Sequence, residues 1–336
     1  MRIPKFNVDG DTPVQSRRVA CTAVGAVLAI LTLPTLAQNY PTRPVRIVTT
    51  FSAGSGPDVM LRHVSEKLSA KWGQPVVIEN RPGGSGFIAA SAVRGQPADG
   101  YVLLHSDSLN FTAMPAMYKK LPYANGDFVP LTPVHRSFFY VAVASDSPYK
   151  NLSELFAAAK QPDAVTFGSW QIGSVAHLGG ATLESALNTK MRHIPYRDNM
   201  QMLAAVASKD VVWAFTSLAS AGPLQRSGKL RFLAYAAPER DPLTPEVPTF
   251  SEAGGPANFQ LSGWVVLSCP KGLPDGLASR ISADVASAMS AADIRAKMTE
   301  IGYTPTPMTP SATRDLLDKD MAVFSATAKR AGIVLE

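Results

Sequence analysis

The chain has 336 residues, of which 46% are hydrophobic, so it is long enough to bury a full core in one large or two medium domains. Its formal net charge is +6, and basic residues neither form runs nor alternate with aromatic residues. This pattern argues against nucleic acid as a partner, whereas a mild positive charge suits the attraction of small anions.

Residues 1–37 are predicted to be a secretory signal peptide. Arg17 and Arg18 precede the apolar run "VACTAVGAVLAILTL", and small residues follow it near a cleavage point after Ala37. An uncleaved membrane anchor is the alternative, but it would need about 20 apolar residues. Only Cys269 remains after cleavage, so no intramolecular disulfide is expected. No later apolar run is long enough to cross a membrane.

After the leader, the pattern alternates between strand and helix. Short runs rich in branched residues predict strands, and stretches with apolar residues at helical spacing predict helices. The first part gives strand, helix, strand, helix and strand over residues 45–51, 58–73, 74–80, 87–95 and 101–107. This order predicts a parallel sheet with helices packed on its faces.

The second part repeats this architecture. Strands are predicted over 138–148, 165–170, 191–196, 211–217, 230–236 and 259–269, and helices over 151–161, 176–188, 200–210, 274–289, 291–302 and 311–332. Two α/β lobes explain the repeat better than one very large sheet. We expect lobe 1 to comprise residues 38–141 and 263–336 and lobe 2 to comprise 142–262, with crossing strands at about 139–145 and 261–268.

The stretch "TTFSAGSGPDVM", residues 49–60, has the form of strand, glycine-rich turn and helix start. It lacks the lysine of a P-loop, and Val59 stands where a dinucleotide fingerprint needs its third glycine. Backbone amides, the hydroxyls of Ser52 and Ser55 and a helix N-terminus still favour an anion. Asp58 is expected to cap its own helix. An empty structural turn is the alternative.

A second loop of the same kind, "FGSWQIGSVAHL", occupies residues 167–178. Two such loops on two lobes can face each other across a cleft and hold one small anion between them. His177 follows this second loop and has two interpretations, a ligand donor or a packing and capping residue. The pair of loops is more specific than either loop alone.

Catalytic and metal-binding patterns are absent from the sequence. The segment "GGSGF" at residues 83–87 fails the nucleophile elbow G-x-S-x-G, and the five histidines show no metal-ligand spacing. A Ser-x-x-Lys match at 147–150 contains a proline and is expected by chance. We therefore predict no enzymatic activity, no cofactor and no metal.

A series of segments resembles the Bug proteins, the periplasmic solute-binding components of tripartite tricarboxylate transporters. The opening "YPTRPVRIVTTFSAGSGPDVM", then "PADGYVLL", "NLSELFAAAK", "FGSWQIGSVAHL", "HIPYR", "PEVPTFSEAG" and "SGWVVLSCPKGLP" stand in the family's order. The resemblance implies an α/β fold of the two-lobe periplasmic binding protein class, type II-like, with two crossover strands around a ligand cleft. It also implies a small carboxylate ligand, a membrane permease as partner and no catalysis. We expect a monomer.

The resemblance also implies which residues bind the ligand. In the family, backbone amides and small hydroxyls of two loops hold a carboxylate, and a turn and a strand end line the same side of the cleft. The corresponding residues here are Phe51, Ser52, Ala53, Gly54, Ser55, Gly56, Asp58, Ser85, Ser106, Ser108, Ser169, Trp170, Ile172, Gly173, Ser174, His177, Tyr196, Arg197 and Thr216.

Three departures from the family pattern bear on the ligand. Trp170 and Ile172 replace small polar residues, which suggests an apolar wall in the cleft, although Trp170 turned outward at the rim is the alternative. Thr216 stands where the family often has an aspartate, so a negative charge that would repel a second negative group of the ligand is absent. Arg197 replaces a lysine and either holds a distal carboxylate or stays solvated.

These departures favour an aromatic dicarboxylate, such as terephthalate or another phthalate isomer, as the ligand. An aliphatic di- or tricarboxylate such as citrate is the alternative. Two other functions are alternatives: a sensor subunit that presents its ligand to a signalling receptor, and a secreted α/β hydrolase. The hydrolase would need the nucleophile elbow that the sequence lacks.

Overall fold

The computed structural model describes residues 40–161 and 164–330, so the predicted signal peptide lies outside the described residues. Ten strands form two five-stranded mixed sheets within this part of the chain. The predicted α/β class is therefore confirmed. No helix among the described residues is both long and apolar enough to span a bilayer.

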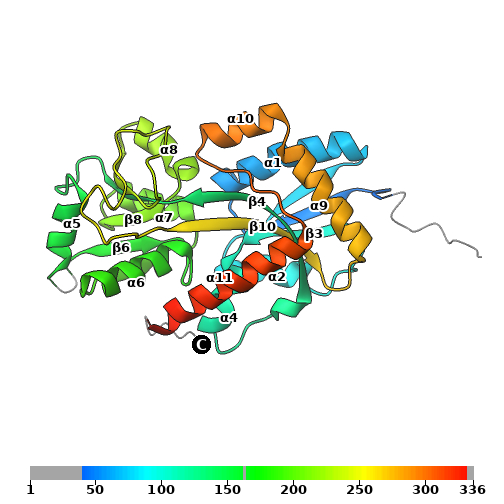
Figure 1. The fold of residues 1–336 in the computed structure, drawn as a ribbon, viewed down its shortest axis with the longest axis horizontal. Helices are drawn as coiled ribbons and strands as arrows, with labels where there is room; N and C mark the ends of the chain where they lie inside the picture. Colours follow the sequence, from blue (N-terminus) through cyan, green and yellow to red (C-terminus); the bar gives the residue numbers. More distant parts are fainter. Residues whose placement is uncertain (1–39, 162–163, 331–336) are drawn as a thin grey trace, which may run out of the picture. The chain divides into compact units, whose positions relative to one another are not determined.

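The first sheet has the strand order β2–β1–β3–β10–β4. Strand β1 is parallel to β2 and β3, whereas β10 is antiparallel to both of its neighbours, β3 and β4. The bounds are β1 Val45–Thr49, β2 Val76–Asn80, β3 Val102–Asp107, β4 Phe128–Phe138 and β10 Ser262–Pro270. Figure 1 shows β4 and β10 running side by side along their paired length.

The second sheet has the order β7–β6–β8–β5–β9. Strand β6 is parallel to β7 and β8, and β5 is antiparallel to β8 and β9. The bounds are β5 Tyr140–Ala144, β6 Thr166–Ser169, β7 Arg192–Pro195, β8 Trp213–Thr216 and β9 Leu230–Tyr235. In each sheet the fourth strand of the order, β10 in the first and β5 in the second, is antiparallel to both of its neighbours.

Helices follow most of the parallel strands. Their bounds are α1 Gly56–Trp72, α2 Phe87–Val93, α3 Leu109–Thr112, α4 Met114–Met117, α5 Leu152–Ala159, α6 Val175–Leu187, α7 Asn199–Ala207, α8 Leu218–Arg226, α9 Asp275–Met289, α10 Ala292–Glu300 and α11 Pro310–Arg330. Several ends follow from the sequence: Asn151 caps α5 by accepting from the Glu154 amide at 2.9 Å, and Gly73 ends α1 at φ 65°.

The chain passes from the first sheet to the second at Phe139 and returns before Ser262. At this junction the Phe139 amide donates to the Leu261 carbonyl (3.2 Å), and the Leu261 amide donates to the Ala236 carbonyl (2.9 Å). The Ala236 amide donates to the Phe139 carbonyl (2.8 Å) and closes the ring. The three residues are buried. Lobe boundaries at 141/142 and 262/263 remain our proposal.

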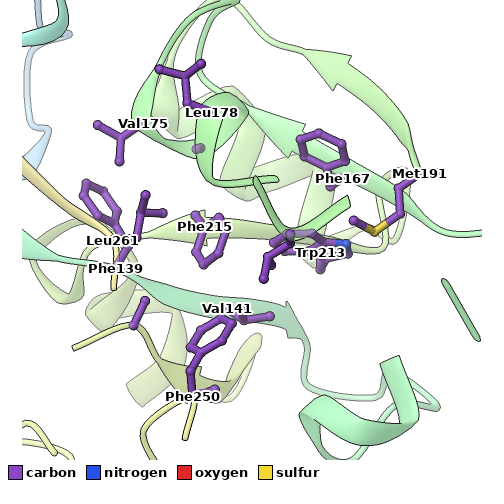
Figure 2. Packing of buried hydrophobic residues seen from close by; sticks show 14 of the residues in the cluster. Phe139, Val141, Phe167, Val175, Leu178, Met191, Trp213, Phe215, Phe250 and Leu261 are labelled. Atoms are coloured by element: carbon purple, nitrogen blue, oxygen red, sulfur yellow. The ribbon is translucent and has the colours of Figure 1, made fainter. Parts of the chain in front are cut away.

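A buried hydrophobic cluster surrounds this junction on the side of the second sheet. It contains Phe139 and Leu261 together with Val141, Trp213 and Phe215 of the neighbouring strands. Figure 2 shows these side chains with Phe167 and Phe250 packed around them. The junction is therefore held by both backbone hydrogen bonds and apolar packing.

Strand β4 and helix α8 were not predicted from the sequence, and neither were the short helices α3 and α4. Strand β4 contains Pro130 and Pro133, which lack the amide donor that a central strand needs, so the sequence argued against a strand there. The strand is tolerated because β4 is at the edge of its sheet, with β10 as its neighbouring strand. Helix α8 was missed because Pro223 lies inside it.

Two glycine substitutions are expected to have opposite effects on stability. A Cβ at Gly180 of α6 would overlap the buried ring of Phe167, whereas a Cβ at Gly276 of α9 would meet nothing within 4 Å. We expect Gly180→Ala to lower the free energy of unfolding by about 1–3 kcal/mol. Gly276→Ala should leave it unchanged or raise it by up to about 1 kcal/mol. Urea denaturation measures both, and equal effects would contradict the packing.

Candidate functional site

A cavity of about 70 Å³ is lined by residues of both sheets. Its lining lies at the carboxyl ends of parallel strands: the loop after β1, the end of β3, and the loops after β6, β7 and β8. Ligands of open α/β sheets bind in the crevice at this end of the strands. The volume accommodates a small organic molecule or several waters.

Rings form much of the cavity wall. Phe51, Phe139, Trp170, Trp264 and Tyr303 all belong to the lining. Trp170 stacks on Phe139 with ring centroids 5.7 Å apart and an interplanar angle of 24°. The sequence left open whether Trp170 points into the cleft; the structure places it in the wall. Ile172, its predicted companion, is not part of the lining.

Three helices begin at the cavity. Ser55 and Pro57 of the α1 start, Asp198 and Asn199 of the α7 start and Ser217 of the α8 start belong to the lining. The free amides of a helix N-terminus carry a partial positive charge, which favours an anion. Asp198 already caps α7 with its own carboxylate, whereas the caps of α1 and α8 form no side-chain hydrogen bond, so the starts of α1 and α8 favour negative groups without lysine or arginine.

The first loop is braced by Asp58. This buried carboxylate accepts hydrogen bonds from the Gly54 amide (2.9 Å), Arg62 Nε (3.0 Å) and Nη2 (3.1 Å), and Asn80 Nδ2 (2.6 Å). Burial alone raises the pKa of Asp58, but the bonds from Arg62, Asn80 and Gly54 outweigh it and lower the pKa below its usual value. Asp58 thus holds the loop in shape and does not line the cavity.

Ser52 is the polar side chain of this loop that is free for a ligand. Its Oγ is buried without a hydrogen-bond partner in the described part of the chain, and Ser52 lines the cavity. Ser55 Oγ instead donates to the Ser52 carbonyl at 2.8 Å. Gly56 is needed for close packing, since a Cβ there would lie 2.5 Å from Tyr303 Oη. Ala53 is exposed and outside the lining.

The second loop uses most of its polar groups internally. Ser169 Oγ donates to the Gln171 carbonyl at 2.8 Å, and Ser174 Oγ accepts from the His177 amide at 3.3 Å and caps α6. The Gly173 amide donates to His177 Nδ1 at 3.0 Å. Trp170 and Gln171 are the residues of this loop in the cavity lining.

Two stacked histidines support the second loop from behind. The rings of His177 and His193 lie 3.9 Å apart at 9°. Because the single hydroxyl proton of Ser169 goes to Gln171, His193 Nε2 must donate to Ser169 Oγ over their 2.7 Å contact. Burial lowers the pKa of His177 to about 4 and that of His193 to about 3, so both rings are neutral at pH 7.

Other predicted residues also lie outside the lining. Ser85 Oγ pairs with Tyr118 Oη at 3.0 Å, Tyr196 is outside the wall, and Thr216 is buried. Arg197 does line the cavity; it is exposed and forms no ion pair within the described residues. Ligand contact by any of the predicted residues stays a prediction.

The end of β3 contributes a different residue from those predicted. Ser106 and Ser108 are buried, their Oγ atoms have no partner among the described residues, and neither lines the cavity. Asp107 lines it instead. The pattern of the segment "HSDS" alone did not show which of its residues lines the cavity.

The remaining lining residues were not among those predicted to bind the ligand. They are Thr50, Pro57, Gly83, His135, Ser137, Phe139, Gln171, Asp198, Asn199, Met200, Ser217, Ser220, Gly263, Trp264, Val265 and Tyr303. Thr50, Pro57, Gly83 and Gln171 lie in the predicted loops and turn, and the others lie elsewhere. Most lie on β4, on β10 or at the starts of α7 and α8, where only the tertiary fold brings them together. Among the described residues, no group of three or more His, Cys, Asp or Glu side chains is placed to hold a metal ion.

The chain was compared with known proteins. The family model "Tripartite tricarboxylate transporter family receptor" matches residues 60–332. Protein BugT of Bordetella pertussis is 28% identical over 332 residues, which cover 96% of this chain and 99% of BugT.

Two solved structures from Rhodopseudomonas palustris are similar in fold. Rpa4515 with adipate is 29% identical with a TM-score of 0.83, covering 88% of this chain and 99% of that one. MatC with bound malate is 27% identical with a TM-score of 0.80, covering 86% and 99%. These matches agree with the fold class and the resemblance found in the sequence.

Removal of the Asp58 carboxylate is expected to destabilise the protein. Asp58→Ala leaves the donors of Arg62, Asn80 and Gly54 without their acceptor, which should cost about 2–3 kcal/mol in urea denaturation. Asp293→Ala, which removes an exposed ion pair with Lys67, is the control and should leave the midpoint unchanged. Equal effects of the two substitutions would contradict a bracing role for Asp58.

Acid is expected to destabilise the protein through the buried histidines. The pKa of each histidine is lower in the folded state than in the unfolded state, where it is near 6.5. Its contribution to the free energy of unfolding is therefore full above about pH 6.5 and is lost as the pH falls toward about 4. His193→Gln removes one titrating group and keeps an amide donor for Ser169. Its free energy of unfolding should fall less steeply between pH 6.5 and 4.5 than that of the wild type. An unchanged dependence of the free energy of unfolding on pH would contradict the neutral stacked pair. His63→Gln on α1 is the control substitution.

Proposed function

This chain belongs to the Bug-type family of tripartite tricarboxylate transporter receptors, and from that premise we propose that it is a periplasmic solute-binding protein for a small carboxylate. It would deliver its ligand to the membrane permease subunits of such a transporter and act as a monomer. The family is one of transport receptors, which supports binding and not catalysis as the role of the cavity.

One observation carries this proposal: the N-termini of α1, α7 and α8 meet at a cavity between the two sheets. A carboxylate placed there would accept hydrogen bonds from loop amides and from the unpartnered Ser52 hydroxyl, and the helix dipoles would stabilise its charge. Adipate and malate in two similar structures are carboxylates as well, which supports the same ligand class here.

We further propose that the ligand contains an aromatic ring. Phe51, Phe139, Trp170 and Trp264 give the cavity flat apolar walls against which a ring can stack. The ring of an aromatic dicarboxylate such as terephthalate fits this wall, and the helix ends, with Arg197 beside the start of α7, fit one of its carboxylates. An aliphatic di- or tricarboxylate, such as citrate, is the competing ligand.

Calorimetric titration of the mature protein with terephthalate, phthalate, adipate, malate and citrate tests the ligand class. We expect an aromatic acid to bind most tightly and, at 100 times its dissociation constant, to stabilise the protein by about 2.7 kcal/mol in thermal shift. Trp170→Ala should weaken the aromatic acid roughly tenfold, about 1.4 kcal/mol. The same variant should change the affinity of aliphatic acids much less, which controls for damage to the fold.

Two results would separate the alternatives. Tight citrate binding without any response to aromatic acids would remove the aromatic ligand and leave the carboxylate receptor intact. Absence of binding by every carboxylate, in a protein that unfolds cooperatively, would overturn the receptor proposal itself.

A further inference from the structure

A buried carboxyl group lies in the wall of a cavity that otherwise favours anions. Asp107, at the end of β3, is 7% exposed and lines the cavity. It pairs with Val265 of β10, which in turn pairs with His135 of β4, so the three residues form one row across three strands. All three belong to the cavity lining, so this row faces the ligand space.

The carboxyl group of Asp107 has little to neutralise it. Its Oδ1 accepts one hydrogen bond, from the Leu109 amide at 3.1 Å, and it forms no ion pair within residues 40–161 and 164–330. Asp58, in contrast, holds its charge with Arg62 beside it. Burial raises the pKa of Asp107 to about 6, opposed only by the bond from Leu109.

The titratable groups in the same wall do not supply a counter-charge. His135 stacks on Tyr303 at 3.9 Å, and burial lowers the pKa of this histidine well below its usual value, so it is neutral. Asp198 is used as the α7 cap, accepting from the Gln201 amide at 2.9 Å. Arg197 is the cation of the described lining, and it is exposed to solvent.

The elements packed directly on β3 add no partner either. Arg46 of β1 is paired with Glu79 of β2 at 2.6 Å. Helix α2 contains no titratable residue, and β10 contains only Cys269, at its far end. On β3 itself, burial lowers the pKa of His105 to about 3, so this ring is neutral.

We propose that Asp107 selects the second functional group of the ligand. Near neutral pH it favours a carboxylate whose far end is a hydrogen-bond donor, such as an ammonium group, and it admits a second carboxylate only together with a proton shared between the two carboxyl groups. This inference rests on the proposed function, since it assumes that the first carboxylate binds at the helix ends.

The reason is the cost of two adjacent buried negative charges. Two ionised carboxylates in contact away from bulk water repel each other strongly, because the surrounding dielectric constant is low. One proton taken from solvent converts this repulsion into a hydrogen bond, as in paired carboxyl groups that share one proton. An ammonium group needs no such proton, and it also interacts favourably with the rings of Trp170 and Trp264 in the wall.

Two ligands that differ only at the far end provide the test: terephthalate and 4-(aminomethyl)benzoate. Calorimetry at pH 8 should show at least tenfold tighter binding of 4-(aminomethyl)benzoate by the wild type. Above pH 6 Asp107 is ionised, so terephthalate should bind about tenfold more weakly per pH unit and take up about one proton on binding. Titrations in buffers of different ionisation enthalpy measure that proton uptake.

Asp107→Asn removes the charge and keeps the shape. This variant should lose the preference for 4-(aminomethyl)benzoate and bind terephthalate without proton uptake and with little change between pH 6 and 8. Asp146→Asn, at an exposed ion pair with Lys209, should behave as the wild type. If Asp107→Asn does not fold, the proton uptake of the wild type on binding terephthalate still tests the role of Asp107.

The outcomes separate this inference from the proposed function. Terephthalate binding by the wild type without proton uptake, or an unchanged preference in Asp107→Asn, would overturn the role of Asp107 and leave the receptor proposal in place. Failure of both probes and of adipate and malate to bind either protein at any pH would overturn the receptor proposal.

Discussion

A closed ring of three backbone hydrogen bonds joins the two sheets, and the cavity depends on it. Phe139, Ala236 and Leu261 each donate one amide and accept at one carbonyl, so all three chain segments that meet at the junction are tied together. Phe139 belongs both to this ring and to the cavity wall. The alignment of the two sets of strand ends is therefore fixed by the backbone beside the ligand space, and side-chain packing around Phe215 reinforces it.

The proposed affinity of the cavity for anions would come from the backbone more than from charged side chains. Three helix N-termini reach the wall, whereas its cation, Arg197, is exposed. Partial charges on helix ends cost no side-chain entropy and do not require a long chain to be ordered on binding. This arrangement agrees with the composition, in which a small net charge is spread along the chain without basic runs.

Most of the framework could be predicted because it is encoded locally. The strand before "FSAGSGPD" and the helix after it follow from branched residues, glycine and helical spacing. The partners of the polar groups could not be predicted, because they depend on tertiary contacts. Ser169, Ser174 and His177 have the chemistry of ligand donors, yet they bond within the second loop. Asp107 required knowledge of which face of β3 meets the cavity, and β4 was hidden by prolines that an edge strand tolerates.

In the proposed complex, the positions of opposite charges in the wall would give a bound ligand a direction. Positive helix ends reach the cavity from α1 on the first sheet and from α7 and α8 on the second, whereas the carboxyl group of Asp107 lies at the end of β3. In the proposed complex, a ligand with unlike ends lowers its energy in one orientation only, with its carboxylate at the helix ends and its donor at β3. A symmetric dicarboxylate has no such preference until one of its ends shares a proton with Asp107, so the charge pattern of the wall discriminates between ligands of the same shape.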